Sequence, residues 1–152
     1  MPRRASRAAI VLTLLGTVFV GVGATGLWMG TAMPDRVAAL LPPEALIDAA
    51  GVGGATVALG VLAGGVGVAH LALVPLVRRS VGVALIGGLM LTATLAVIAV
   101  ASAVAALVTV ASGLGPAAIF VPVAIGLGFL AVAYAWLTAV LIGLRSEARG
   151  AD

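Results

Sequence analysis

The side chain best suited to chemistry is His70, because it is the one ionisable group inside four long apolar stretches of this sequence. Histidine can exchange a proton near neutral pH, bind a metal through a ring nitrogen or form a hydrogen bond. An ionisable residue in an apolar medium is therefore a functional hypothesis by default. A neutral ring costs much less to bury than a charge does. We expect a structural polar contact at His70, with a ligand or proton site as the alternative.

The remaining residues give little support for cofactor chemistry. The chain has no cysteine and no second histidine, so it lacks the donor sets of zinc, haem-attachment and thiol redox sites. Met29, Met33 and Met90 are weak companions for a metal ion. The scattered hydroxyl side chains have no evident base or orienting acid beside them. We expect no cofactor, no metal site, no catalytic residue and no enzymatic activity.

Four apolar stretches, residues 8–33, 51–77, 81–112 and 116–144, must position these groups. A helix crosses the hydrocarbon core of a bilayer with about 20 residues, and each stretch reaches that length. Of the 152 residues 63% are hydrophobic and 9% are charged, against about 45–50% and about 25% in soluble domains. Barrel strands would alternate apolar and polar side chains, and these stretches do not. The sequence predicts an all-α polytopic membrane protein, a four-transmembrane-helix bundle that forms a single membrane domain over residues 1–152.

The placement of arginine predicts the orientation of this bundle. The loop between the first two stretches holds Arg36 together with Asp35, Glu44 and Asp48. All other arginines lie at the two termini or between the second and third stretches, and they are Arg3, Arg4, Arg7, Arg78, Arg79, Arg145 and Arg149. The positive-inside rule then predicts a multi-pass protein of the cell membrane with both termini cytoplasmic. The net charge of +3 reflects topology, so we expect the lipid bilayer and not nucleic acid as the partner.

The first stretch also resembles a signal peptide, because basic residues 3–7 precede an apolar segment. The apolar segment continues through Leu27, Trp28 and Met29, which makes it longer than a usual signal core. We expect this stretch to be retained as the first helix.

Residues 34–48 form the longest connector between the apolar stretches. Residues 35–41 predict a short amphipathic helical turn, which Pro42 and Pro43 would end. Acidic residues at the start of the next helix would suit its dipole. We expect an external amphipathic loop that caps this helix, with a docking or lid element as the alternative.

Small residues spaced four apart predict where helices approach one another. Lipid removes most of the hydrophobic drive for helix association, so close packing must replace it. The expected packing residues are Gly26, Gly30, Gly60, Gly64, Ala131, Ala135, Ala139 and Gly143. Packing within the bundle is the preferred interpretation, and a surface for a homo-oligomer or a larger membrane complex is the alternative. At the polar ends, Arg78 and Arg79 could contact anionic lipid headgroups.

These observations favour a small membrane helical-bundle protein that serves as a non-catalytic accessory, scaffold or assembly subunit. The alternative is an oligomeric transporter, channel or pore for a small solute, for which glycine content, Pro122 and His70 are the supporting features. A membrane enzyme or cofactor carrier that uses His70 is the least favoured hypothesis.

Overall fold

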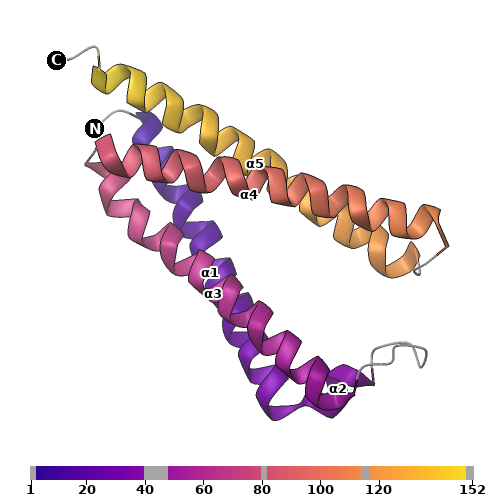
Figure 1. Ribbon diagram of the computed structural model, residues 1–152. Helices are drawn as coiled ribbons and strands as arrows, with labels where there is room; N and C mark the ends of the chain where they lie inside the picture. Colours follow the sequence, from indigo (N-terminus) through magenta and orange to yellow (C-terminus); the bar gives the residue numbers. More distant parts are fainter. Residues whose placement is uncertain (1–2, 40–47, 80–81, 114–116, 150–152) are drawn as a thin grey trace. The chain divides into compact units, whose positions relative to one another are not determined.

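The computed structural model describes residues 3–39, 48–79, 82–113 and 117–149, and within these ranges the chain is helical with no strand (Figure 1). The helices are α1 (Arg3–Ala32), α2 (Pro34–Ala38), α3 (Ala49–Arg78), α4 (Gly82–Ala111) and α5 (Ala117–Arg149). The four long helices contain 30, 30, 30 and 33 residues. Each of the four is long and apolar enough to cross a membrane. The all-helical prediction is confirmed over the described residues.

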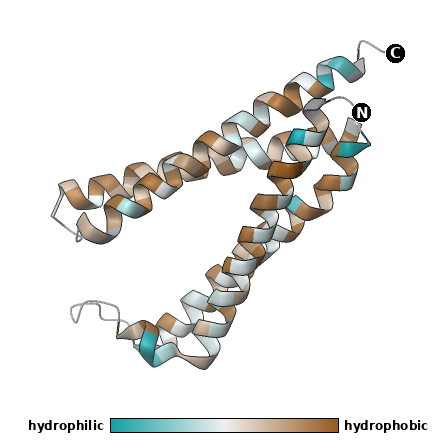
Figure 2. Cartoon of the chain, turned by 180° about the vertical axis from the view of Figure 1, so that it is seen from behind, coloured by the Kyte–Doolittle hydropathy of each residue, from teal (hydrophilic) through white to brown (hydrophobic). Residues whose placement is uncertain are grey.

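The long helices extend beyond some of the apolar stretches that predict them. The first begins at Arg3 instead of residue 8, and the last continues to Arg149 instead of residue 144. Arginine, alanine and glutamate are good helix formers, so a helix that starts in apolar sequence continues through them. Figure 2 shows this pattern, with hydrophobic colour along the long helices and hydrophilic residues at α2 and near the two chain ends.

The chain divides into two compact units. One contains residues 9–75, and therefore most of α1, all of α2 and most of α3. The other contains residues 1–8 and 76–152, and therefore α4, α5 and the first turns of α1. A single membrane domain over residues 1–152 stays a prediction.

In the 9–75 unit, glycines bring the backbones of α1 and α3 into direct contact. A Cβ atom added to Gly67 would lie 2.8 Å from the carbonyl oxygen of Gly16. The same atom on Gly60 would lie 2.9 Å from the oxygen of Gly23. On Gly53 it would lie 2.9 Å from the oxygen of Gly30. We call this set the glycine interface, and it consists of Gly16, Gly23, Gly30, Gly53, Gly60 and Gly67.

The glycines of this interface are seven residues apart on both helices. Gly16 pairs with Gly67, Gly23 with Gly60 and Gly30 with Gly53, so α1 and α3 are antiparallel. A seven-residue repeat keeps one stripe of an α-helix facing a partner helix, as in left-handed helix pairs. Without side chains at these positions the two backbones approach closely, which maximises van der Waals contact and allows weak Cα–H···O contacts. Close packing of glycine therefore joins the first hairpin.

Two of the predicted packing residues also belong to this contact region without being part of the repeat. A Cβ atom on Gly26 would lie 3.0 Å from the Cα of Gly60. Gly64 supplies the atoms nearest to Gly23, with its nitrogen 2.6 Å from an added Cβ. The structure thus places Gly26, Gly30, Gly60 and Gly64 together between α1 and α3.

In the second unit, α4 and α5 pack against each other. Four buried residues of α4 again occur at seven-residue steps, namely Leu85, Thr92, Ala99 and Ala106, and Gly88 is buried between the first two. On α5 the predicted stripe divides, because Ala131 is buried, Gly143 is half-buried, and Ala135 and Ala139 are exposed. An α-helix has 3.6 residues per turn. Residues spaced four apart therefore move gradually around the helix surface, whereas residues spaced seven apart stay closer to one face. Packing by Ala135 and Ala139 stays a prediction.

The connector after α1 begins with a short helix. Pro34 occupies the first turn of α2, where a missing N–H costs nothing. Residues 40–47, including Pro42, Pro43 and Glu44, lie outside the described residues. At the far end of the connector, the carboxylate of Asp48 accepts a hydrogen bond of 2.7 Å from the backbone N–H of Gly51, which caps α3.

The glycine interface predicts a difference between two glycines of α3. Gly60→Ala should lower the free energy of unfolding by roughly 1–3 kcal/mol, because the new methyl group would meet the backbone nitrogen of Leu27 at 2.8 Å. Gly54→Ala is the matched control, since nothing lies within 4 Å of an added Cβ there. It should stabilise the helix by up to about 1 kcal/mol. Denaturant unfolding in one detergent measures both, and equal stabilities would contradict the assigned interface.

Candidate functional site

His70 lies on α3 in the 9–75 unit, and its side chain is fully buried. Its Nδ1 atom is 2.6 Å from the carbonyl oxygen of Val66, one helical turn earlier. A carbonyl oxygen can only accept, so Nδ1 carries the proton that is donated. In the neutral ring this leaves Nε2 as the acceptor.

An aromatic contact also holds the His70 ring. Phe19 of α1 stacks on it with ring centroids 6.0 Å apart and an angle of 5° between the ring planes. This stack links α1 and α3 in addition to the glycine interface. One nitrogen bonded to the backbone and one face covered by Phe19 fix the orientation of the imidazole, as a structural polar residue requires.

A metal ion would need further donors around His70. Within the described part of the chain, no three side chains of His, Cys, Asp or Glu come together in a way that could hold a metal ion. His70 alone therefore offers one nitrogen, whereas structural zinc sites use four protein ligands and catalytic zinc sites use three.

Most threonine hydroxyls form hydrogen bonds within their own helices. Each donates a hydrogen bond of 2.7–2.9 Å to the carbonyl oxygen four residues earlier, and these residues are Thr13, Thr17, Thr31, Thr56 and Thr109. This local bond satisfies a hydroxyl without any neighbouring helix. A hydroxyl used in this way lacks the adjacent base that a nucleophile needs.

One pair of hydroxyls, on Thr92 and Thr138, joins two helices. The Thr138 hydroxyl is 2.9 Å from the Thr92 hydroxyl and 2.8 Å from the carbonyl oxygen of Tyr134, and its proton serves one of these acceptors at a time. The Thr92 hydroxyl can donate to the carbonyl oxygen of Leu89 at 3.3 Å. The contact between these two residues could not be inferred from the sequence, because they are 46 positions apart. Thr92 could have been found from its place in the seven-residue pattern of α4.

Two hollows in the second unit combine arginine with apolar side chains. The first has a volume of about 280 Å³ and is lined by Arg7, Trp136, Ala139 and Val140. Arg7 comes from the first turns of α1, and the other three residues come from α5. The sequence predicts Ala139 as a packing residue, and the structure places it among the residues that line this hollow together with Arg7.

The second hollow has a volume of about 320 Å³ and is lined by Leu89, Ile142, Arg145 and Ser146. The Ser146 hydroxyl donates to the carbonyl oxygen of Gly143 at 2.8 Å, so its proton is already used. Arg78 and Arg79, the arginines expected at anionic lipid, are exposed at the end of α3 and line neither hollow.

Comparison of the chain with family models, with curated proteins and with solved structures found no match. The functional argument therefore rests on the described residues themselves.

The contacts of His70 predict a stabilising role for this residue. His70→Ala should lower the free energy of unfolding by roughly 1–3 kcal/mol, since it removes a buried hydrogen bond and an aromatic stack. His70→Phe retains the stack and should lose less. The control Leu62→Ala removes a side chain that is 66% exposed, and it should change stability little in detergent. Unchanged unfolding of His70→Ala would contradict the structural role.

Proposed function

We propose that this chain is an integral membrane protein whose four long helices cross the bilayer. The supporting observation is the apolar surface that these helices expose. Large hydrophobic side chains project outward on all of them, including Leu14 (62% exposed), Leu59 (68%), Val97 (68%) and Phe129 (74%). Surfaces of this kind are unfavourable in water but match hydrocarbon. Helices satisfy their backbone hydrogen bonds internally, as a bilayer requires.

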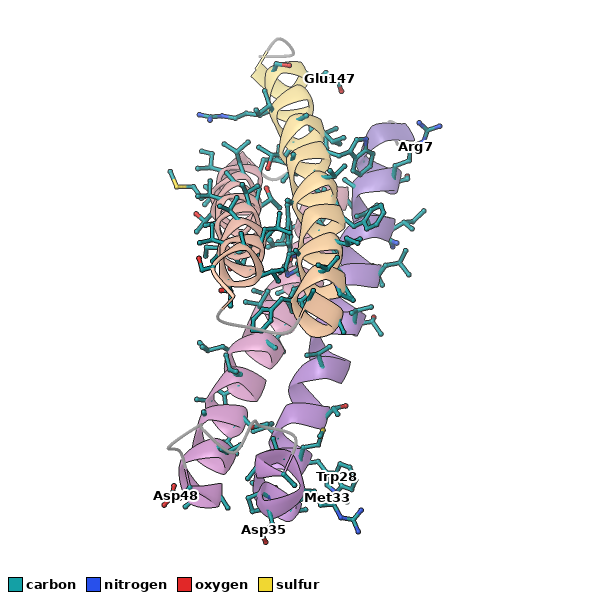
Figure 3. All side chains as sticks on the ribbon, turned by 90° about the vertical axis from the view of Figure 1, so that its right-hand side faces the viewer. Arg7, Trp28, Met33, Asp35, Asp48 and Glu147 are labelled. Carbon is teal, nitrogen blue, oxygen red and sulfur yellow. The ribbon has the colours of Figure 1, made fainter. Side chains whose placement is uncertain are left out.

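The proposed topology has both termini in the cytoplasm. Its support is the excess of arginine at the termini and at the joint between α3 and α4. Asp35, Asp48 and Trp28 lie at the same end of the first hairpin, the end that carries α2 (Figure 3). Trp28 is 55% exposed, which suits an indole at a membrane–water interface. We assign this end to the outer side.

Within the membrane, the proposed role is that of a non-catalytic accessory or assembly subunit. The observation that carries this proposal is a second stripe of small residues on α3. It consists of Gly51, Ala58, Gly65 and Ala72, which are seven apart and all exposed. The spacing is the one used by the glycine interface, but this stripe faces outward. Small residues at such spacing are typical of helix–helix contacts in membranes, so the stripe suits a transmembrane helix of another subunit.

The topology can be tested with single cysteines, because the natural sequence contains none. Ser6→Cys on α1 should react with a membrane-impermeant maleimide only after the cells are permeabilised. Ser112→Cys, just after α4, should react in intact cells. Both serines are exposed, so access and not burial decides the outcome. Labelling of Ser6→Cys from outside would overturn the proposed orientation.

The assembly role predicts a species larger than one chain when membranes are extracted in mild detergent. Ala58→Leu combined with Gly65→Leu should reduce this species to the single chain, because leucine would block approach of a partner helix. Gly21→Leu is the control, since it places the same side chain where nothing lies within 4 Å of the added Cβ.

A wild-type protein that remains a single chain, both in mild detergent and after chemical cross-linking in the membrane, would overturn the assembly role. Proton or potassium flux through reconstituted vesicles, lost in His70→Ala, would support the transport alternative instead.

A further inference from the structure

The hollow at Arg7 has a chemical character that the assembly role does not explain. Trp136, Ala139 and Val140 are spaced three and four apart, so they share one face of α5. Arg7 adds a guanidinium group from the start of α1 in the same compact unit. Figure 3 shows the Arg7 side chain extending outward from the end of its helix.

Each lining residue contributes a distinct property. Arginine keeps its charge at any physiological pH, and its planar fork of N–H groups matches a phosphate group. The Trp136 ring is 42% exposed, so much of it is available to a ligand. Ala139 is exposed and small, which leaves room above the helix for a chain. The hollow is therefore one fixed positive charge beside an apolar surface.

The order of the lining residues along α5 matches the order of headgroup and acyl chain in a phospholipid. From Val140 to Trp136 the helix rises about 6 Å, and this direction leads away from the arginine-rich end of α5. Arg7 lies near the arginine-rich start of α1, so on the proposed topology a phosphate bound by it would lie toward the cytoplasmic headgroups. The chain attached to it would run over Val140 and Ala139 toward Trp136. Inorganic phosphate would use the guanidinium group but not the apolar surface.

We propose that the Arg7–Trp136 hollow is a binding site for an anionic phospholipid of the cytoplasmic leaflet, a proposal that rests on the membrane topology given above. The Arg7 guanidinium binds the phosphate, and Trp136, Ala139 and Val140 contact the start of an acyl chain. The Arg145 hollow lacks an aromatic ring, and its Ser146 proton is already donated. The lipid assignment is therefore made at Arg7.

Tryptophan fluorescence gives a direct readout of this site. The chain has two tryptophans, so Trp28→Phe leaves Trp136 as the only indole. In vesicles of phosphatidylcholine with a small fraction of brominated phosphatidylglycerol, Trp136 should be quenched more than with the same fraction of brominated phosphatidylcholine. Arg7→Gln should lower the apparent affinity for phosphatidylglycerol roughly tenfold, the size expected when a charge-assisted bond is lost. Ala139→Leu should reduce quenching by filling the hollow.

Two controls separate a built site from general attraction to charge. Arg79→Gln removes the same charge just after α3, at the proposed cytoplasmic side and outside this hollow, and should leave the preference intact. Ala105→Leu is the control for Ala139→Leu. It enlarges an exposed alanine of α4 that is not among the lining residues, so it should leave quenching unchanged. Arg7→Lys keeps the charge but loses the fork, and should give an intermediate affinity. It also serves as the test variant if Arg7→Gln fails to fold.

Three outcomes would overturn the lipid site. They are equal quenching by the two brominated lipids, an equal loss of preference in Arg7→Gln and Arg79→Gln, and displacement of the lipid by inorganic phosphate. The last would assign the site to free phosphate. Flotation of the protein with the vesicles separates this failure from failure of the membrane proposal. A protein that floats but shows no preference refutes only the lipid site.

Discussion

Close approach of helix backbones is the constraint on which the first hairpin depends. In hydrocarbon, apolar side chains gain little by leaving lipid, so helices associate through contact area and weak polar contacts. Glycine every seventh residue on α1 and α3 meets this requirement, because Gly53, Gly60 and Gly67 of α3 each face a carbonyl oxygen of their α1 partner. Even one methyl group at Gly60 or Gly67 would meet backbone atoms. A chain with few large polar contacts is thereby held together.

Polar side chains on the long apolar helices mostly form hydrogen bonds within their own helix. Threonine hydroxyls return to the carbonyl four residues earlier, and His70 does the same through Nδ1. The Thr138 hydroxyl also reaches the carbonyl oxygen four residues earlier, and in addition it meets the Thr92 hydroxyl between α4 and α5. With their hydrogen bonds made locally, these groups have little left for catalysis. The outward stripe on α3 and the hollow at Arg7 are the features that we propose engage other molecules.

Arginine carries two kinds of information in this chain. Its count on each side of the apolar stretches predicts topology, and this could be read from the sequence alone. Its local surroundings could not. The adjacent Arg78 and Arg79 suggested a contact with anionic lipid, which stays a prediction, and the structure adds two hollows lined in part by Arg7 and Arg145. A pair of neighbouring charges is visible in sequence, but an indole and an alanine beside a distant arginine are not.

The sequence by itself determined the four long helices, their apolar surface and the small residues available for packing. Composition and periodicity suffice for this, because they depend only on local geometry and on the surrounding medium. Tertiary structure decided which small residues meet a neighbour. Gly60 packs against α1, while Ala135 and Ala139 stay exposed. It also brought Arg7 to Trp136. The physical reason is that contacts between helices depend on rotation and register, which packing of whole helices sets and a spacing rule of four residues does not.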